Sequence, residues 1–443
     1  MQLISVLHSA LPKIVAVLPY VCYGFLALLF FTGVVRLILL ARSTALLKRH
    51  VRSLRAVDYR RFQDSEHLMP VSLILPATNV TGRLNEQIDN LLKLEFKQYE
   101  LIVVANSAHA DAWQSLYEGY SLLPFRQPFK KTLKSAHVEA VYRSAKDVRL
   151  VVLDIRDASS AGALNAGVNM SSYPIIMPVH PDLRLTKDAL LKTVYAFVSD
   201  PACVFIGSVA RIGDGAEEEA DNRMPILAQQ QCIERLRAIY SNRAGYQEIG
   251  QDLSLQGQLA AFLKSAVVEA GGFSDEAKAE ETDLLLRIHA RLRKEKRVYH
   301  VKLLPDAVCY ALPQKRMRDV CEAERQGQRK MRDSIRRNRA VTRALRGAGY
   351  LRFTEKTLPL VELLGIFTAL VSTALGAVPP LFLALYLLLG VLFGSVLSVL
   401  SVLLEEYAFQ RKTDTGLLLG RYLLAILDNF GFRLRVAFAR IFS

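Results

Sequence analysis

The stretch that decides the fold is VSLILPATNV at residues 71–80, which leads through a helical segment to ELIVV at residues 100–104. The first stretch is almost entirely apolar up to Pro76, which is typical of a buried strand that ends at a proline. Between the two stretches, residues 83–94 carry apolar side chains at helical spacing, namely Leu84, Ile88, Leu91 and Leu92. A strand, a helix and a second strand in this order predict the start of a parallel sheet.

Further short apolar stretches follow at 149–153, 175–179 and 203–209, separated by segments of helical character. We therefore predict an α/β fold, in which a mixed, mostly parallel sheet carries helices on both faces. In such sheets ligands bind at the carboxyl ends of the strands. The informative side chains should be those that directly follow each strand.

Two stretches without charged residues, 14–35 and 363–404, flank this soluble part. A helix needs roughly 20 apolar residues to cross a bilayer, so the first predicts one transmembrane helix. The second predicts a hairpin of two, divided by the Pro379–Pro380 pair. A cleaved signal peptide is the alternative for the first stretch, but the apolar run is too long and lacks a small-residue cleavage site.

Basic residues follow the first span: Arg36, Arg42, Lys48, Arg49, Arg52, Arg55, Arg60 and Arg61. The positive-inside rule places this end in the cytosol, which predicts a multi-pass protein of the bacterial inner membrane with a cytosolic soluble domain. The formal net charge is +15, and residues 315–352 hold thirteen Lys/Arg against four Asp/Glu. Because this charge lies beside apolar segments, we expect anionic membrane lipids as partners and no nucleic acid.

The pattern predicts six regions. They are an N-terminal transmembrane helix (1–41), a basic linker (42–69), a cytosolic domain (70–335), a basic juxtamembrane segment (336–357), a transmembrane hairpin (358–404) and a cytosolic amphipathic interfacial helix (405–443). The five cysteines show no C-x-x-C spacing, so we expect reduced thiols rather than a zinc or redox site.

Polar motifs follow the predicted strands and begin the predicted helices. They are PATNV (76–80) with ANS (105–107), SAGALNAG (160–167), PVHPD (178–182), and GGF (271–273) with EETDLLLRIH (280–289), then RQGQRK (325–330). In this order and spacing they resemble the membrane glycosyltransferases of family 2, such as cellulose, hyaluronan and poly-N-acetylglucosamine synthases. The resemblance covers roughly residues 70–335.

The resemblance implies a donor site for a nucleotide sugar, formed by Pro76, Asn79, Asn106, His180, Asp182 and Arg329. Asn106 stands where the family has an acidic residue that binds the nucleotide; an ordinary loop asparagine is the other interpretation. Asp182 stands where the family binds Mg²⁺ or Mn²⁺, which prefer oxygen ligands; a polar loop without metal is the alternative. Arg329 stands where the family's arginine binds the diphosphate of the donor.

The resemblance also implies that Glu281 is the general base that deprotonates the acceptor hydroxyl, with Glu280, Gln326 and Lys330 on the acceptor side. The structural alternative is an acidic first helical turn that the helix dipole favours. Asn165 either orients backbone near the donor or caps a helix.

Five positions depart from the family pattern: Ala105, Ser160, His180, Glu281 and Lys330. Two functions therefore stay open. The first is an inverting glycosyltransferase that moves a sugar from a nucleotide-diphosphate donor to a polysaccharide or lipid-linked acceptor at the cytosolic membrane face, with or without other polysaccharide-synthesis membrane proteins. The second is a catalytically inactive subunit that acts as a scaffold in an exopolysaccharide assembly complex. A membrane protein that senses lipids or nucleotides is a third and weaker hypothesis.

Overall fold

The structure is a computed structural model. It describes residues 2–56, 62, 68–77, 84–126, 131–156, 159–208, 210–213, 224–243, 259–306, 308–345, 357–409 and 415–442.

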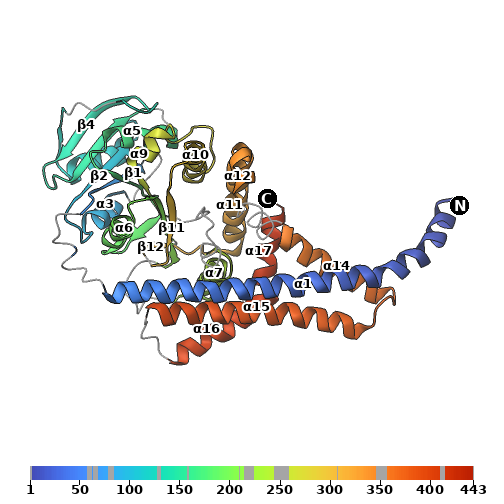
Figure 1. Cartoon of the computed structure of the whole chain (residues 1–443). Helices are drawn as coiled ribbons and strands as arrows, with labels where there is room; N and C mark the ends of the chain where they lie inside the picture. The colour runs from blue at the N-terminus through green and yellow to red at the C-terminus, as the bar shows by residue number, and fades with distance from the viewer. Residues whose placement is uncertain are drawn as a thin grey trace.

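A nine-stranded sheet forms the centre of the soluble domain (Figure 1). Its order is β11 (His300–Leu304), β8 (Cys203–Ser208), β10 (Leu259–Leu263), β6 (Ile175–Pro178), β1 (Val71–Ala77), β2 (Tyr99–Ala105), β5 (Leu150–Ile155), β4 (Val138–Ser144) and β3 (Leu122–Pro124). The four strands β6, β1, β2 and β5 are parallel neighbours. Among the described strands of this sheet, β10 and β4 run against the other seven. The predicted mixed, mostly parallel sheet is confirmed.

Alternating side chains of β1 enter two different cores, as the two-residue period of a strand requires. Leu73 and Leu75 pack with α3 (Leu84–Leu92) and α6 (Ala189–Val198) on one face. Ile74 packs on the other face with α5 (Ser160–Met170) and α10 (Glu280–Lys294). Gly167 lets α5 approach closely, because a Cβ there would lie 2.5 Å from a methyl carbon of Ile74. Helices therefore cover both faces, as predicted.

Smaller elements complete the domain. A three-stranded sheet has the order β7 (Leu183–Leu185), β12 (Cys309–Ala311) and β9 (Arg211–Ile212). The remaining helices are α4 (Ala110–Gly119), α7 (Ile226–Ala238) with its π-helical end η2 (Ile239–Arg243), α9 (Lys264–Glu269), α11 (Met317–Arg337) and α12 (Arg339–Ala344).

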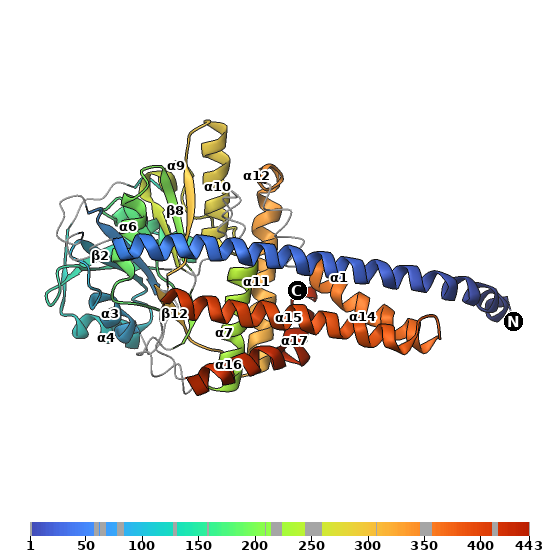
Figure 2. The ribbon, with the colours of Figure 1, turned by 60° about the horizontal axis from the view of Figure 1, so that its bottom comes forward.

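The long helix α1 (Gln2–Ala56) runs beside the hairpin of α14 (Leu358–Ala374) and α15 (Pro380–Phe409), as Figures 1 and 2 show. The hairpin turns where Pro379–Pro380 predicted it. Two described helical segments, Val15–Arg52 and Pro380–Ala408, are long and apolar enough to cross a membrane by length and composition. α14 has 17 residues and so rises about 25 Å, less than a bilayer core of about 30 Å. The third span stays a prediction.

Residues 42–56, which the sequence placed in a basic linker, continue α1 as a helix. The apolar face of this segment explains why it is helical. Leu40 and Leu47 pack in one cluster with Tyr240 and with Leu397 of α15. The hydroxyl of Ser43 donates a hydrogen bond of 2.5 Å to the carbonyl of Tyr240. Tertiary packing therefore extends the helix beyond the apolar run.

The C-terminal segment differs from the single amphipathic helix expected over 405–443. α15 continues through Glu405, and then α16 (Thr415–Leu427), the 3-10 turn η4 (Asp428–Phe430) and α17 (Phe432–Ile441) follow. The chain turns at Asp428, which is fully buried and lies 3.5 Å from a guanidinium nitrogen of Arg237 in α7. This turn lets α17 pack against α11 through Phe432 and Val436.

Candidate active site

The carboxyl ends of the central strands bring the first and third motifs to one edge of the sheet. Ala77 at the end of β1 pairs with Ala105 at the end of β2, and Asn106 follows directly. β6 ends beside β1, where the amide of Val179 donates to the carbonyl of Ile74 at 2.8 Å. Pro76, Asn106 and His180 therefore lie at the same edge. Asn79 lies outside the described residues.

A carboxylate that the sequence analysis missed stands next to Asn106. Asp154 in β5 pairs with Ala105, and its Oδ1 accepts a hydrogen bond of 3.0 Å from the amide of Ser107. The Oδ1 atom of Asn106 accepts from the amide of Ala108 at 2.9 Å, which closes a tight turn. The signal that could have found Asp154 is an acidic residue at the end of an otherwise apolar strand.

His180 and Asp182 lie in the loop between β6 and β7, with side chains 69% and 80% exposed. The His180 Nδ1 and Asp182 Oδ2 atoms are 3.6 Å apart. Across the described part of the chain, no group of three or more His, Cys, Asp or Glu side chains is arranged to hold a metal ion. The loop thus offers one carboxylate and one imidazole to a ligand from solvent.

Asn165 links the second motif to the fourth. This buried side chain donates from Nδ2 to the carbonyls of Lys134 and Phe273, both at 2.9 Å, and its Oδ1 accepts from the amide of Phe273 at 2.8 Å. The cap of α5 is another residue, Ser159, whose hydroxyl accepts from the amide of Gly162 at 2.9 Å. Asn165 is therefore a buried connector between α5 and the GGF turn, not a helix cap.

The GGF turn is held from the other side by α10. Gly271 and Gly272 have φ angles of +85° and +74°, which glycine adopts without strain. The guanidinium of Arg287 donates to the carbonyls of Ala270 and Gly272 at 2.7 and 2.6 Å and to Asp283 at 2.8 Å. These charge-assisted bonds set the position of the first turn of α10.

That first turn carries the candidate base. Burial is the main cause that raises the pKa of Glu280, followed by the charge of Glu281, while a hydrogen bond with Ser160 and the charge of Lys330 oppose the rise. Burial also raises the pKa of Glu281, and the Lys330 charge again opposes it. Both carboxyls are only partly exposed. The structure thus brings Glu280, Glu281, Ser160 and Lys330 together from α10, α5 and α11.

The other predicted residues of α11 lie on its surface. Gln326 is exposed and its Nε2 donates to Glu322, one helical turn away, at 3.3 Å. Arg329 is also exposed. Within the described residues, no recorded contact joins Arg329 or Asp182 to Glu281. The fold shows which edge and which helices these residues occupy, and their convergence on one substrate stays a prediction.

A cleft of about 410 Å³ opens beside the first turn of α10. Thr282 and Lys330 line one side, and Gln231 of α7 and Arg440 of α17 line another. Gln231 is fixed there by two 3.0 Å hydrogen bonds with the backbone of Gln314. The cleft therefore extends from Ala279 and Thr282, on either side of the candidate base, toward α7 and α17.

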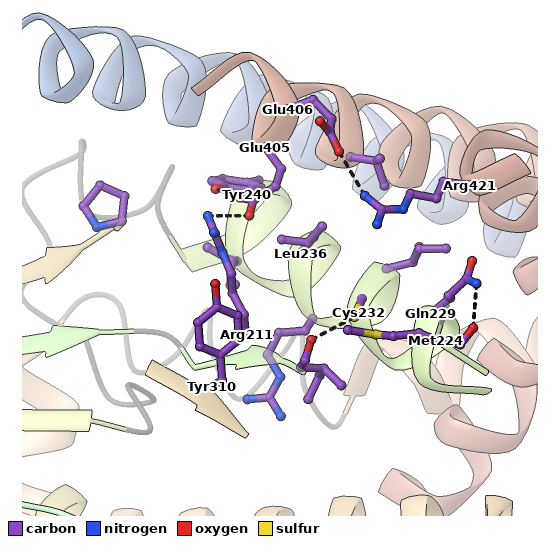
Figure 3. Close-up of a pocket in the computed structure, with 16 residues that line it drawn as sticks. Arg211, Met224, Gln229, Cys232, Leu236, Tyr240, Tyr310, Glu405, Glu406 and Arg421 are labelled. Carbon is purple, nitrogen blue, oxygen red and sulfur yellow. Dashed lines mark hydrogen bonds and ion pairs between the residues drawn. The ribbon is translucent and has the colours of Figure 1, made fainter. Parts of the chain in front are cut away.

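A second, smaller pocket of about 70 Å³ lies where the soluble domain meets α15 and α16 (Figure 3). Arg211 of β9 forms an ion pair of 2.5 Å with Glu405, and the hydroxyl of Tyr240 donates to the same carboxylate at 2.6 Å. Beside them Glu406 pairs with Arg421 at 3.0 Å. These contacts join the sheet to the apolar helices, so the two parts are positioned by buried charge pairs.

Comparison with known proteins bears on the chemistry. The family model described as Glycosyl transferase family 2 matches residues 72–269. Poly-beta-1,6-N-acetyl-D-glucosamine synthase of Staphylococcus aureus (strain MSSA476) is 21% identical over 248 residues, which is 56% of this chain and 51% of that protein. The enzyme of the same name from Staphylococcus epidermidis is 22% identical over 250 residues, 56% of this chain and 52% of that one. The chain spans about half the length of these curated relatives.

Two solved structures show a looser likeness. The mannosyltransferase PcManGT from Pyrobaculum calidifontis, in complex with GDP-Man and Mn²⁺, is 15% identical with a TM-score of 0.45, covering 91% of this chain and 99% of that one. S. aureus TarS residues 1–349 in complex with UDP-GlcNAc is 15% identical with a TM-score of 0.38, covering 81% and 91%. The resemblance inferred from the motifs is confirmed by the family model and the relatives. Residues 72–269 are a glycosyltransferase family 2 domain.

Proposed function

We propose that this chain is an inverting glycosyltransferase. It moves a sugar from a nucleotide-diphosphate donor to a polysaccharide or lipid-linked acceptor at the cytosolic face of a bacterial inner membrane. One observation carries the proposal most directly: Glu281 stands partly buried in the first turn of α10, where the charge of Lys330 acts on its pKa, and the next residue, Thr282, lines a cleft of about 410 Å³. This is the placement that a general base beside an acceptor site needs.

In the proposed reaction the Glu281 carboxylate takes the proton from the acceptor hydroxyl. The hydroxyl oxygen then forms a bond to the anomeric carbon as the bond to the nucleoside diphosphate breaks, so the configuration inverts. A raised pKa makes the Glu281 carboxylate a stronger base than an ordinary glutamate. Glu280 accepts a proton more readily still when Glu281 is charged, since that charge raises its pKa. We assign Glu280, Gln326 and Lys330 to the acceptor side.

We assign the donor to the carboxyl edge of the sheet, with Pro76, Asn106, His180 and Asp182 as its contacts and Arg329 on the diphosphate. Asn79 belongs to the same motif but lies outside the described residues. Asp154, 3.0 Å from the amide of Ser107, supports the turn that presents Asn106. Because ligands of open α/β sheets bind at this edge, the placement of these residues supports the assignment.

The exposed Asp182 carboxylate fits a divalent cation of the Mg²⁺ or Mn²⁺ kind. Mg²⁺ is commonly held by one or two carboxylates together with substrate phosphates and waters, and the loop supplies such a carboxylate with the His180 imidazole 3.6 Å away. When bound, the cation would neutralise charge on the leaving diphosphate. The residues of the donor site position the donor, and Asp182 would contribute to this through its carboxylate oxygens.

The membrane placement rests on helix composition and on charge. Long segments of α1 and α15 are apolar enough to cross a membrane by length and composition. Basic residues such as Arg42, Lys48 and Arg49 follow the apolar part of α1, at the end that adjoins the soluble domain. Under the positive-inside rule that end is cytosolic. Anionic lipids would then face this basic surface.

A non-catalytic scaffold role in exopolysaccharide assembly is the second candidate. The observation that favours it is the donor loop: within the described residues its metal-ligating set is the exposed His180–Asp182 pair, and no third acidic or imidazole group joins them. Such a subunit would keep the fold and the membrane helices without turning over a donor. The two candidates differ in their response to nucleotide and metal.

A direct test uses membranes that contain the full chain and a panel of radiolabelled nucleotide sugars, beginning with UDP-N-acetylglucosamine because the named relatives make an N-acetylglucosamine polymer. We expect transfer of label from one donor, and loss of that transfer in Glu281→Gln. Glu276→Gln is the matched control, since Glu276 is exposed and pairs only at the surface with Arg337. If no donor is used, but the chain binds a partner synthase, the scaffold role replaces the enzymatic one.

A further inference from the structure

A cleft of about 210 Å³ lies among α1, α14, α15 and α17, away from the candidate active site. Glycines bring its walls together: a Cβ at Gly33 would meet the Phe393 ring at 2.7 Å, and one at Gly365 would meet the Tyr386 hydroxyl at 2.1 Å. Its lining is mainly apolar and includes Leu29, Ile366, Leu387, Val391 and Leu397. It lies alongside the segments of α1 and α15 that are apolar enough to cross a membrane.

One end of this cleft is charged. Arg36 and Arg433 share a single carboxylate, Glu362, with nitrogen–oxygen distances of 3.5 and 3.1 Å. Arg433 also donates to the Oδ1 atom of Asn429 at 3.1 Å. The three charged side chains are only 17–21% exposed. Two guanidiniums and one carboxylate leave the lining of the cleft with one excess positive charge.

The Nε atom of Arg36 is buried and has no hydrogen-bond partner among the described residues. A buried, unpaired guanidinium nitrogen destabilises the protein, because no hydrogen bond offsets the free energy of its desolvation. A charged residue at membrane depth commonly marks a binding site for this reason. An anion placed between Arg36 and Arg433 would supply the missing acceptor and balance the excess charge.

We propose that this cleft binds one anionic membrane phospholipid, with its phosphate between Arg36 and Arg433 and one acyl chain along the apolar walls. Guanidinium groups pair well with phosphate oxygens, and basic pockets between membrane helices bind anionic headgroups. The apolar lining favours a lipid over a soluble anion, because a soluble anion has no acyl chain to bury there. The proposal rests on the proposed membrane placement of α1 and α15, but not on catalysis by Glu281.

Charge variants predict opposite effects on lipid binding. The probe is 1-palmitoyl-2-oleoyl-phosphatidylglycerol, added to the full chain in a neutral detergent and counted by native mass spectrometry, with the phosphatidylcholine analogue for comparison. Arg36→Gln and Arg433→Gln should each weaken binding of the anionic lipid about fivefold, as expected for about 1 kcal/mol per arginine. Glu362→Gln removes the competing carboxylate and should strengthen binding by a similar factor.

A second pair of variants tests the apolar part. Gly390 lines the cleft and has open space around a Cβ, so Gly390→Leu should fill the cleft without displacing a neighbour and weaken binding. Gly24→Leu is the matched control: it lies on α1 with the same open space and outside the cleft lining, so it should leave binding unchanged.

Three results would overturn the proposal. They are equal retention of both lipids, loss of binding in Glu362→Gln, and competition by soluble glycerol phosphate as effective as by the lipid, which would indicate a free phosphate site. Nucleoside diphosphate binding is measured in the same samples. If it persists while lipid binding fails, the cleft proposal alone is wrong; if nucleotide binding is absent while lipid binding responds as expected, the proposed function is wrong.

Discussion

The side chain of Asn165 and the backbone of Phe273 are joined by two hydrogen bonds, of 2.9 and 2.8 Å, although 108 residues separate them. The first belongs to α5, which begins at the carboxyl edge of the sheet; the second belongs to the turn before α10. Through this link the edge proposed to bind the donor and the helix proposed to carry the base are held in one rigid arrangement. Asn165, which the sequence left either near the donor or in a helix cap, is therefore used for internal positioning.

Replacement of Asn165 by alanine should destabilise the domain. The change leaves the amide of Phe273 and two carbonyls without partners in a buried place, at about 1–3 kcal/mol for each unsatisfied group. We expect a loss of at least about 2 kcal/mol in the free energy of unfolding, measured by chemical denaturation. Asn85→Ala is the control, because Asn85 makes exposed bonds to Ser115. A loss no larger than that of the control would show that the link carries no stability.

The two adjacent glycines of the GGF turn offer a matched comparison. Both have positive φ, so alanine is strained at either position by about 1 kcal/mol. A Cβ at Gly271 meets open space, whereas one at Gly272 would lie 2.5 Å from Asn165 Oδ1 and 2.7 Å from Leu133. Gly272→Ala should therefore lower the melting temperature clearly more than Gly271→Ala. Equal shifts in the two variants would argue against a tight packing of this turn.

The proposed base predicts the shape of the pH profile of transfer. Because burial raises the pKa of Glu281, kcat/KM should fall as the pH drops through a midpoint above that of an ordinary glutamate. Lys330→Met removes a cation that opposes this rise, so the midpoint should move to higher pH, while Lys330→Arg should keep it. A midpoint unchanged by Lys330→Met would contradict the assignment of Glu281.

Asp182 is expected to connect nucleotide affinity to a divalent cation. Equilibrium binding of the nucleoside diphosphate to wild type should weaken at least tenfold on addition of EDTA, roughly the value of one charge-assisted contact. Asp182→Asn should bind with the weaker affinity and respond little to EDTA. Asp188→Asn, a change at a half-exposed position just before α6, serves as control. An Asp182→Asn variant with full EDTA sensitivity would exclude this carboxylate as the ligand.

Asp428, at the turn between α16 and α17, should make stability depend on pH. Burial raises its pKa to about 7, although the charge of Arg237 opposes the rise. A raised folded-state pKa favours the protonated carboxyl, so its contribution to stability is complete below about pH 4 and is lost as the pH rises through 7. In detergent, Asp428→Asn should match wild type near pH 4, gain on it progressively as the pH rises toward 7, and melt at a higher temperature at pH 8.5. The opposite order at pH 8.5 would show that the charged form is the stabilising one.

Much of the fold could be read from local patterns. The apolar run from Val71 to Leu75 and its proline predicted β1, and Ile175 to Val179 predicted β6, because a strand buried on both faces must be apolar at nearly every position. The hairpin of α14 and α15 followed from Pro379–Pro380. These features depend on neighbours in the sequence, so the sequence alone was sufficient for them.

Other features depend on partners distant in the chain. The continuation of α1 to Ala56 requires Tyr240 and Leu397, and the break at Asp428 requires α7. Asp154 gained its role only when β5 paired with β2.

By itself, the amino-acid sequence determined the strand and helix pattern, the apolar segments and the motifs of a family 2 glycosyltransferase domain. Only the tertiary structure decided which polar residues act on one another, as when Lys330 of α11 comes to oppose the pKa shift of Glu281 in α10. The physical reason is that hydrophobic periodicity is a local property of the chain, whereas burial, electrostatic shifts and hydrogen-bond partners depend on residues that only folding brings together.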